Sequence, residues 1–203
     1  MYICFEGIDG SGKSTLAQTV LATYQQRGIP VILTKEPGGT SLGQQVRSVV
    51  QYAQEPLDAR AEFLLYAADR AQHYTQVIAP ALQNNVTVLS DRGFVSSIAY
   101  QGYGRGLDIG VITQVNNWAL QQCVPDVFVY LDIDPQLAYE RIHARAEKLT
   151  RFEQEKLSFF SRVIEGYEEI FKQYPAVIRL DAHKKQEALL QECMEALASY
   201  EKK

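Results

Sequence analysis

Residues 7–15 carry the clearest chemical pattern of the chain, G-x-x-x-x-G-K-[ST] followed by a threonine. Glycines in such a run let the backbone curl until successive N–H groups point inward, where they can hold phosphate oxygens. Lys13 would bridge the β- and γ-phosphates of a nucleotide, and the hydroxyl of Ser14 would bind Mg²⁺. We therefore predict a phosphate-binding loop that consists of Gly7, Ile8, Asp9, Gly10, Ser11, Gly12, Lys13, Ser14 and Thr15.

This loop alone fits several classes of nucleotide-binding protein. A hydrolysing NTPase, a switch GTPase and a small-molecule kinase can all use it. A switch GTPase should also carry an N-K-x-D run that reads guanine, and the sequence has none. Its absence favours a kinase, and a nucleotide-dependent switch or interaction module remains the alternative from another class.

Short apolar runs and longer amphipathic stretches alternate along the chain, and these elements must position the loop. The apolar runs, at 2–5, 30–34, 86–90, 127–132 and 176–180, are typical of buried parallel strands. Helical periodicity covers 14–27, 60–79, 109–122, 136–146, 154–173 and 186–200. Alternating units of this kind predict one α/β domain with an open parallel sheet and right-handed crossovers.

Further polar runs follow the predicted strands, at the edge of the sheet where ligands bind in open α/β folds. They are 34–40 (TKEPGGT), 91–102 (DRGFVSSIAYQG) and, around the later helices, 65–70 (LYAADR), 141–145 (RIHAR) and 150–155 (TRFEQE). Tyr66 and Arg70 are four residues apart, so they share one helix face. An aromatic ring there can stack on a base while the guanidinium reaches its polar edge or a phosphate.

Together with 5–10 (FEGIDG), these runs resemble the bacterial thymidylate kinases over nearly the whole chain. The resemblance implies the nucleoside monophosphate kinase architecture of the P-loop NTPases, an open five-stranded parallel sheet with helices on both faces. It also implies phosphoryl transfer from ATP, with Mg²⁺, to dTMP, giving dTDP and ADP in a homodimer. A P-loop kinase for another deoxynucleoside monophosphate is the alternative.

The same resemblance assigns roles around the acceptor. On the base, it places Tyr66 against the thymine ring, Arg70 on the base, and Ser97 and Gln101 on the pyrimidine edge. On the sugar, it places Tyr100 against the 2′ position and Asp9 on the 3′-OH. Arg47 and Arg92 lie near the acceptor phosphate, and Glu36 and Pro37 belong to the same dTMP-binding set. Asp91 is expected to hold Mg²⁺ through water beside Ser14, and orienting Arg92 is its alternative role. No general base is required, because the phosphate dianion of the acceptor is itself nucleophilic.

A basic segment between two predicted helices completes the expected site. Arg141, Arg145 and Arg151 flank a polar stretch that also holds Lys148. Mobile cations that close over a transferred phosphoryl group stabilise its charge and exclude water. We predict a lid at about 141–153 and the catalytic residues Lys13, Arg92, Arg151 and Arg141, with Arg151 the best positional match and Arg145 left open.

Three positions depart from the pattern of the resembled family. Lys35 stands where Arg is frequent, Gly93 where Tyr, Phe or His is usual, and Val95 in a pair where an acidic residue is often found. These changes lie on the acceptor side, so they bear on the choice of acceptor more than on phosphoryl transfer.

Composition limits the partners. The net charge is −4, with 24 acidic and 20 basic residues, whereas nucleic-acid binders usually carry a basic excess. The three cysteines are widely spaced and form neither a disulfide framework nor a zinc pattern. The N-terminus has no basic region before an apolar run, and no stretch approaches the roughly 18 apolar residues of a membrane span. We expect a cytoplasmic protein that binds neither nucleic acid nor membrane, with a dimer interface on the helices at 60–79 and 109–122 as a candidate.

Overall fold

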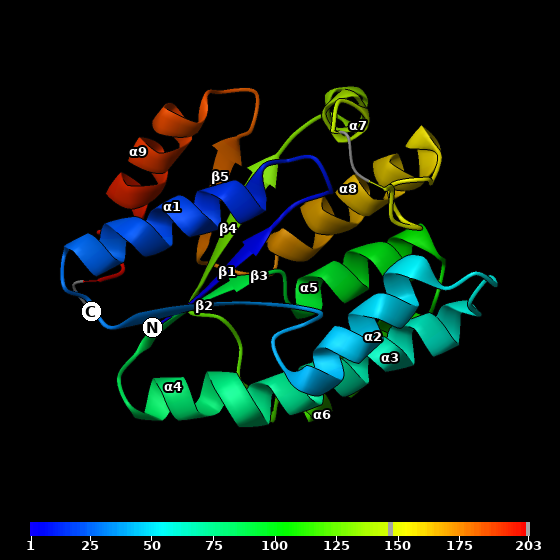
Figure 1. Cartoon of the computed structure of the whole chain (residues 1–203), viewed down its shortest axis with the longest axis horizontal. Helices are drawn as coiled ribbons and strands as arrows, with labels where there is room; N and C mark the ends of the chain where they lie inside the picture. The colour runs from blue at the N-terminus through cyan, green and yellow to red at the C-terminus, as the bar shows by residue number, and fades with distance from the viewer. Residues whose placement is uncertain (146–147, 202–203) are drawn as a thin grey trace.

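Five short parallel strands run through the centre of the molecule (Figure 1). The computed structural model describes residues 1–145 and 148–201. The strands are β1 (Tyr2–Glu6), β2 (Val31–Lys35), β3 (Thr87–Asp91), β4 (Val127–Asp132) and β5 (Val177–Asp181). They pair in the order β2-β3-β1-β4-β5, and each pair is parallel. β1 is buried along its whole length, as expected of a central strand covered on both faces.

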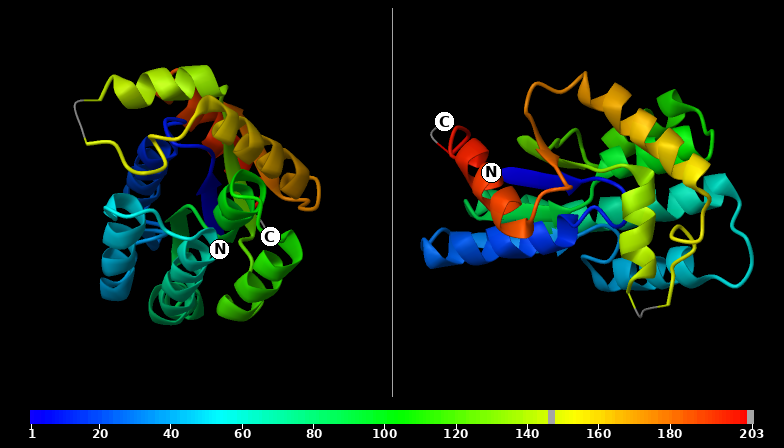
Figure 2. Two further views of the ribbon diagram at one scale, coloured as in Figure 1. Left: turned by 90° about the vertical axis from the view of Figure 1, so that its right-hand side faces the viewer. Right: turned by 90° about the horizontal axis from the view of Figure 1, so that it is seen from above.

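Helices connect the strands and cover both faces of the sheet (Figures 1 and 2). They are α1 (Lys13–Gln26), α2 (Ser41–Tyr52), α3 (Ala59–His73), α4 (Ala79–Gln83), α5 (Phe94–Ser97), α6 (Ile109–Ala119), α7 (Pro135–His143), α8 (Leu157–Phe171) and α9 (Gln186–Leu197), with π-helical turns η1 (Tyr74–Ile78) and η2 (Ile98–Gly104). α1 packs against α9, α8 packs against η2, and α3 against α6. The predicted α/β class is confirmed. Across the described part of the chain, no helix combines the length and apolar character needed to cross a membrane.

Aromatic side chains join β4 to α8. The ring of Phe128 lies 5.5 Å from that of Phe171, and the ring of Tyr130 lies 5.3 Å from that of Tyr167. Such tilted and edge-on pairs add to the apolar area that the rings bury. They fix α8 on the sheet, and α8 begins at Leu157, shortly after the predicted lid ends.

The predicted strands end within one residue of the observed ones, but several helices differ. The helix predicted at 60–79 is interrupted by η1, and the one at 109–122 ends at Ala119, before Gln121 and Gln122, whose φ angles are 49° and 64°. The helix predicted from residue 154 begins at Leu157, because Thr150 and Glu153 close a turn in which Thr150 N donates to Glu153 Oε2 at 2.8 Å. The helix predicted at 136–146 is α7, which ends at His143, and residue 146 lies outside the described residues. α2, α5 and η2 were not predicted.

Candidate active site

A cavity of about 810 Å³ opens at the carboxyl ends of the strands. The loops that follow β1, β2, β3 and β5 all reach it, as in other open α/β sheets, where this edge holds the ligands. Its residues of predicted function are Asp9, Gly10, Gly12, Lys13, Ser14, Thr15, Glu36, Pro37, Arg47, Tyr66, Arg70, Asp91, Arg92, Ser97, Tyr100, Gln101 and Arg141. The fold therefore brings most of the predicted site residues to one place.

The loop between β1 and α1 has the curled backbone that its glycines predict. Gly10 and Gly12 have φ angles of 82° and 91°, which glycine adopts without strain. A side chain at Gly10 would also come within 2.5 Å of Ala138 O in α7. Gly7, Ile8 and Ser11 form the inner wall of the loop and are not among the cavity-lining residues.

Lys13 opens α1 and lies almost fully buried beside the loop. Its Nζ donates to Ile8 O at 3.4 Å and lies 3.5 Å from Asp9 Oδ1. Burial and the nearby Arg92 lower the pKa of Lys13, although Asp9 and Asp91 act in the opposite direction. The ammonium group is therefore held where a phosphate would replace weak protein contacts with strong ones.

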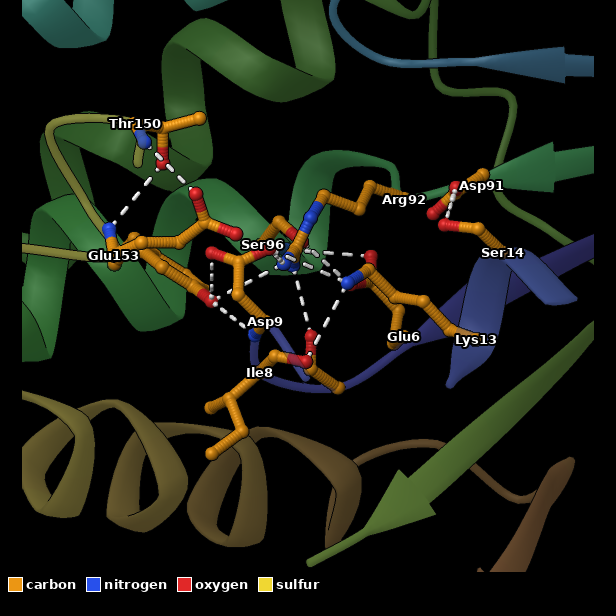
Figure 3. A network of polar contacts seen from close by, with 12 residues as sticks. Glu6, Ile8, Asp9, Lys13, Ser14, Asp91, Arg92, Ser96, Thr150 and Glu153 are labelled. Atoms are coloured by element: carbon orange, nitrogen blue, oxygen red, sulfur yellow. Dashed lines mark hydrogen bonds and ion pairs between the residues drawn. The ribbon is translucent and has the colours of Figure 1, made fainter. Parts of the chain in front are cut away.

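Arg92 follows β3 and points across the loop toward Asp9 (Figure 3). Its Nη2 lies 2.8 Å from Asp9 Oδ1, and its Nη1 donates to Gly7 O at 2.9 Å. The φ angle of Arg92 is 73°, a left-handed conformation that is uncommon for arginine. Burial alone would raise the pKa of Asp9, but Arg92 and Lys13 hold it well below its ordinary value. Asp91 does not hold Arg92, so the structure gives no support to that alternative role.

A buried carboxylate behind the loop holds the backbone after Arg92. Glu6 accepts hydrogen bonds from Gly93 N at 2.9 Å, Ser96 Oγ at 2.6 Å and Tyr167 OH at 3.0 Å. Burial raises the pKa of Glu6 despite these donors and the charge of Arg92. This network supports the strained turn at Arg92, and sequence reasoning did not find it, because its members come from three distant segments.

Ser14 and Asp91 face each other apart from Arg92, with Ser14 Oγ 2.5 Å from Asp91 Oδ2 (Figure 3). Asp91 Oδ1 is buried and has no hydrogen-bond partner among the described residues. A hydroxyl and a carboxylate with a free oxygen form a donor set that suits Mg²⁺. The residues present therefore fit the predicted metal.

Arg70 is the most enclosed cation of the site, with an exposed fraction of 1%. Its Nε donates to Glu36 Oε2 at 2.8 Å, its Nη1 to Ser97 Oγ at 3.1 Å and to Asn116 Oδ1 at 2.7 Å, and its Nη2 to Gly93 O at 3.2 Å. A guanidinium has five N–H donors, so one donor on Nη2 remains for a ligand. The sequence did not predict Asn116 or the ion pair between Arg70 and Glu36.

Glu36 lies between two buried basic side chains, those of Arg70 and His73. His73 Nδ1 lies 3.0 Å from Glu36 Oε1, and His73 Nε2 lies 2.6 Å from Thr34 Oγ1. Burial would raise the pKa of Glu36, but Arg70 and His73 together hold it below its ordinary value. Asp69 lies on α3, one helical turn before His73, and burial and Glu36 raise its pKa to about 6.

The segment that follows residue 147 in the predicted lid passes beside the end of α2 (Figure 2), where Arg151 N donates to Gln51 O at 3.1 Å. Residues 146–147 of the predicted range 141–153 lie outside the described residues. Arg141, Arg145 and Lys148 line the cavity, and Arg141 Nη2 donates to Ala182 O at 3.0 Å. Arg151 does not line it. Its Nη1 lies 3.8 Å from Glu62 Oε2, so in this structure the best-matched lid arginine faces away from the phosphate loop, a difference from the expectation.

The three departures from the expected pattern differ in their surroundings. Lys35 and Gly93 line the cavity, whereas Val95 is fully buried and does not. A side chain at Gly93 would come within 2.9 Å of Cys4 Sγ in β1. A larger residue at this position would therefore require the Cys4 side chain or the turn to shift.

Comparisons with known proteins agree with this geometry. A family model described as thymidylate kinase matches residues 5–193. Curated relatives include a thymidylate kinase from Halothermothrix orenii, 42% identical over 95% of this chain and 93% of the relative, and one from Exiguobacterium sp., 40% identical over 96% and 92%. The crystal structure of thymidylate kinase from Ehrlichia chaffeensis superposes with a TM-score of 0.78 at 32% identity, covering 97% of this chain and 98% of that one. The chain belongs to the thymidylate kinase family.

Proposed function

We propose that this protein transfers the γ-phosphoryl group of ATP to dTMP, giving dTDP and ADP. The observation that carries the proposal is a single cavity with a phosphate loop at one end and, at the other, an aromatic ring beside an enclosed guanidinium and an amide, those of Tyr66, Arg70 and Gln101. A phosphate donor and a nucleobase acceptor can bind in this cavity at once. Such proximity is the larger part of catalysis in phosphoryl transfer.

In the reaction, an oxygen of the dTMP phosphate forms a bond to the γ-phosphorus of ATP, and the bond from that phosphorus to the β–γ bridging oxygen breaks. ADP leaves with that oxygen, and no general base is needed, because the acceptor phosphate is a dianion at neutral pH. Lys13 neutralises charge on the transferred group. Arg92 lies between the loop and Tyr100, where it can turn from Asp9 to the acceptor phosphate.

Ser14 and Asp91 would hold Mg²⁺, Asp91 through a water molecule. A magnesium ion held by these two residues would supply positive charge that offsets the negative charge of the nucleotide phosphates. The support is the free buried oxygen of Asp91 and the short contact between the two side chains. The carboxylate of Asp91 accepts a hydrogen bond from the Ser14 hydroxyl and so keeps it in position.

The lid supplies the remaining positive charge. Arg141, Arg145 and Lys148 line the cavity, so we assign them to the transferred phosphoryl group. Arg151, which the sequence favoured, would reach that group only after releasing Glu62. Water exclusion by the closed lid protects ATP from hydrolysis.

We also propose a homodimer that pairs the exposed faces of α3 and α6. Trp118 is 82% exposed and Leu64 is 57% exposed, and Val111 and Ile109 add to this apolar area. Exposed apolar residues that lie together on adjacent helices mark interaction surfaces. A charged residue at Leu64 should convert the dimer to a monomer in sedimentation experiments, and an unchanged mass would contradict this interface.

The function is tested by ADP release with Mg²⁺-ATP and, in turn, dTMP, dUMP, UMP, dGMP, dCMP or no acceptor. We expect release that depends on the acceptor and is fastest with dTMP, with dTDP identified as the product. Preference for another monophosphate would overturn the acceptor assignment and direct attention to Lys35 and Gly93, which line the cavity. Release without any acceptor would favour a nucleotide-driven switch instead.

A further inference from the structure

Glu62 is a buried carboxylate directly behind the acceptor end of the cavity. It lies in the first turn of α3, is 1% exposed, and does not line the cavity. Its charge is balanced by two guanidinium groups. Arg105 Nε lies 3.3 Å from Glu62 Oε1, and Arg151 Nη1 lies 3.8 Å from Glu62 Oε2. Burying a carboxylate away from water is costly, so the groups that contact Glu62 indicate what it contributes.

The third partner of Glu62 is Gln101. The amide Nε2 of Gln101 donates to Glu62 Oε1 at 3.0 Å, and both side chains are buried. Among the described residues, Gln101 Oε1 accepts no hydrogen bond, and Gln101 lines the cavity. An ionised carboxylate accepts hydrogen bonds and donates none. The contact therefore turns the nitrogen of this amide toward Glu62, where it uses one of its two N–H donors, and leaves Oε1 for a ligand.

We propose that Glu62 is a positioning residue that selects the base of the acceptor by fixing the amide orientation of Gln101. This inference rests on the proposed function and says how the acceptor end distinguishes thymine from cytosine. A fixed Oε1 accepts from the N3–H of thymine or uracil. Cytosine has an unprotonated N3 there, which would face another acceptor. A site built to hydrogen-bond one partner rejects an analogue that lacks it, because a buried polar group is left unpaired.

The lid takes part in this arrangement. Arg105 Nη1 lies 2.5 Å from Glu155 Oε1, so Glu62 shares this guanidinium group with a residue that lies just after the lid. The lid residue Phe152 packs on Tyr100, with ring centroids 5.5 Å apart, and Arg105 lies 5.3 Å from its ring. These contacts keep Arg105 in place beside Glu62.

The test is the ratio of kcat/KM for dTMP to that for dCMP in Glu62→Gln. A glutamine at 62 keeps the shape of the side chain but can also donate, so the Gln101 amide is free to turn. We expect the ratio to fall by about tenfold or more, the size of one net hydrogen bond. A merely structural role would lower both values together and leave the ratio unchanged, which would overturn the proposal.

Glu155→Gln is the matched control, because it makes the same change on the other partner of Arg105 and has no contact with Gln101 among the described residues. Its ratio should stay within about twofold of the unmodified enzyme. An equal fall in both variants would assign the effect to the charge of Arg105 and contradict the proposal. In a Gln101→Met background, Glu62→Gln should leave the ratio unaltered, because the two residues act through one amide.

The unmodified enzyme provides a test that does not depend on folding of a variant. dTMP methylated at N3 lacks the N–H and should be used at least about tenfold less well than dTMP. Equal use of the two would overturn the proposal. An enzyme that forms no dTDP at all overturns the proposed function itself, whereas an active enzyme with an unaffected ratio in Glu62→Gln overturns only the role of Glu62.

Discussion

The acceptor end of the cavity and its lid end are built in different ways. At the acceptor end, Arg70 is 1% exposed and makes hydrogen bonds to four other residues. At the lid end, Arg145 is about half exposed, and its ion pair with Glu153 is long, at 3.7 Å. Arg141 holds one backbone carbonyl, that of Ala182. One end is a connected polar network, and the other is a set of loosely held cations.

We infer that this difference separates recognition of the acceptor from the chemistry of transfer. A connected, buried network can present fixed donors and acceptors to a base, but it cannot move without losing many bonds at once. Loosely held cations can follow the charge that develops on a transferred phosphoryl group. The comparison predicts that changes at the acceptor end alter stability and specificity, and that changes at the lid end alter turnover.

The largest effect is expected for Arg70→Ala. It leaves Glu36 buried beside His73 without its guanidinium partner, and breaking such a pair costs about 3–5 kcal/mol. We expect a marked loss in the free energy of unfolding, measured by urea denaturation, together with loss of dTMP use. Arg141→Ala is the control from the lid end and should leave unfolding almost unchanged. Equal losses in the two variants would break the comparison.

Lys13→Ala tests the loop that both ends share. Its ammonium group makes only long contacts, at 3.4 and 3.5 Å, so the fold does not depend on it. We expect kcat to fall by about 100- to 1,000-fold, as when one electrostatic contact to a transition state is removed, with the melting temperature preserved. A variant with near-normal kcat would remove Lys13 from the chemistry.

Asp69→Asn tests what it costs to bury an ionised carboxylate beside Glu36 at the acceptor end. Burial and Glu36 raise the pKa of Asp69 from 3.8 to about 6, so the folded state binds a proton more tightly than the unfolded state. The stability contributed by that proton is complete below about pH 4 and is lost as the pH rises through 6. The variant should therefore be more stable than the unmodified protein at pH 7.5, by on the order of 2 kcal/mol, and equal to it near pH 4. Parallel stability curves would contradict the assignment.

The smallest effect separates two lid arginines. Arg145 lines the cavity, and Arg151 faces Glu62. Arg145→Ala should lower kcat by about tenfold with little change in the KM for dTMP, and Arg151→Ala should affect kcat less. If Arg151→Ala has the larger effect on kcat, then the lid must rearrange and bring Arg151 over the phosphates, as the sequence alone suggests.

Much of this site could be predicted because its signals are local. The run of 7–15 dictates a curled loop, and apolar runs of five or six residues indicate buried strands, which together place the cavity at the strand ends. α2 was missed because it follows a glycine-rich turn closely and shows few strongly apolar residues, of which Val46 and Val50 are buried.

The partners of the predicted residues could not be found in this way. Asn116 and Arg70 are in contact although they are 46 residues apart in the sequence, and Gln101 and Glu62 although they are 39 residues apart. A local sequence pattern cannot predict contacts between residues so far apart in the chain. Glu62 does precede Tyr66 by one helical turn, a spacing that could have drawn attention to it. The direction in which a side chain points could not be predicted from the sequence either. Arg151 points to Glu62 because α3 and the lid lie next to each other in the fold.

The most direct test of a preformed acceptor end is calorimetric titration of the enzyme with dTMP in the absence of ATP. The networks around Arg70 and Gln101 consist of hydrogen bonds between protein groups, so we predict saturable binding of one dTMP per chain, with much weaker binding of dCMP. Binding of dTMP only after a non-hydrolysable ATP analogue is added, or equal binding of dCMP, would contradict the account.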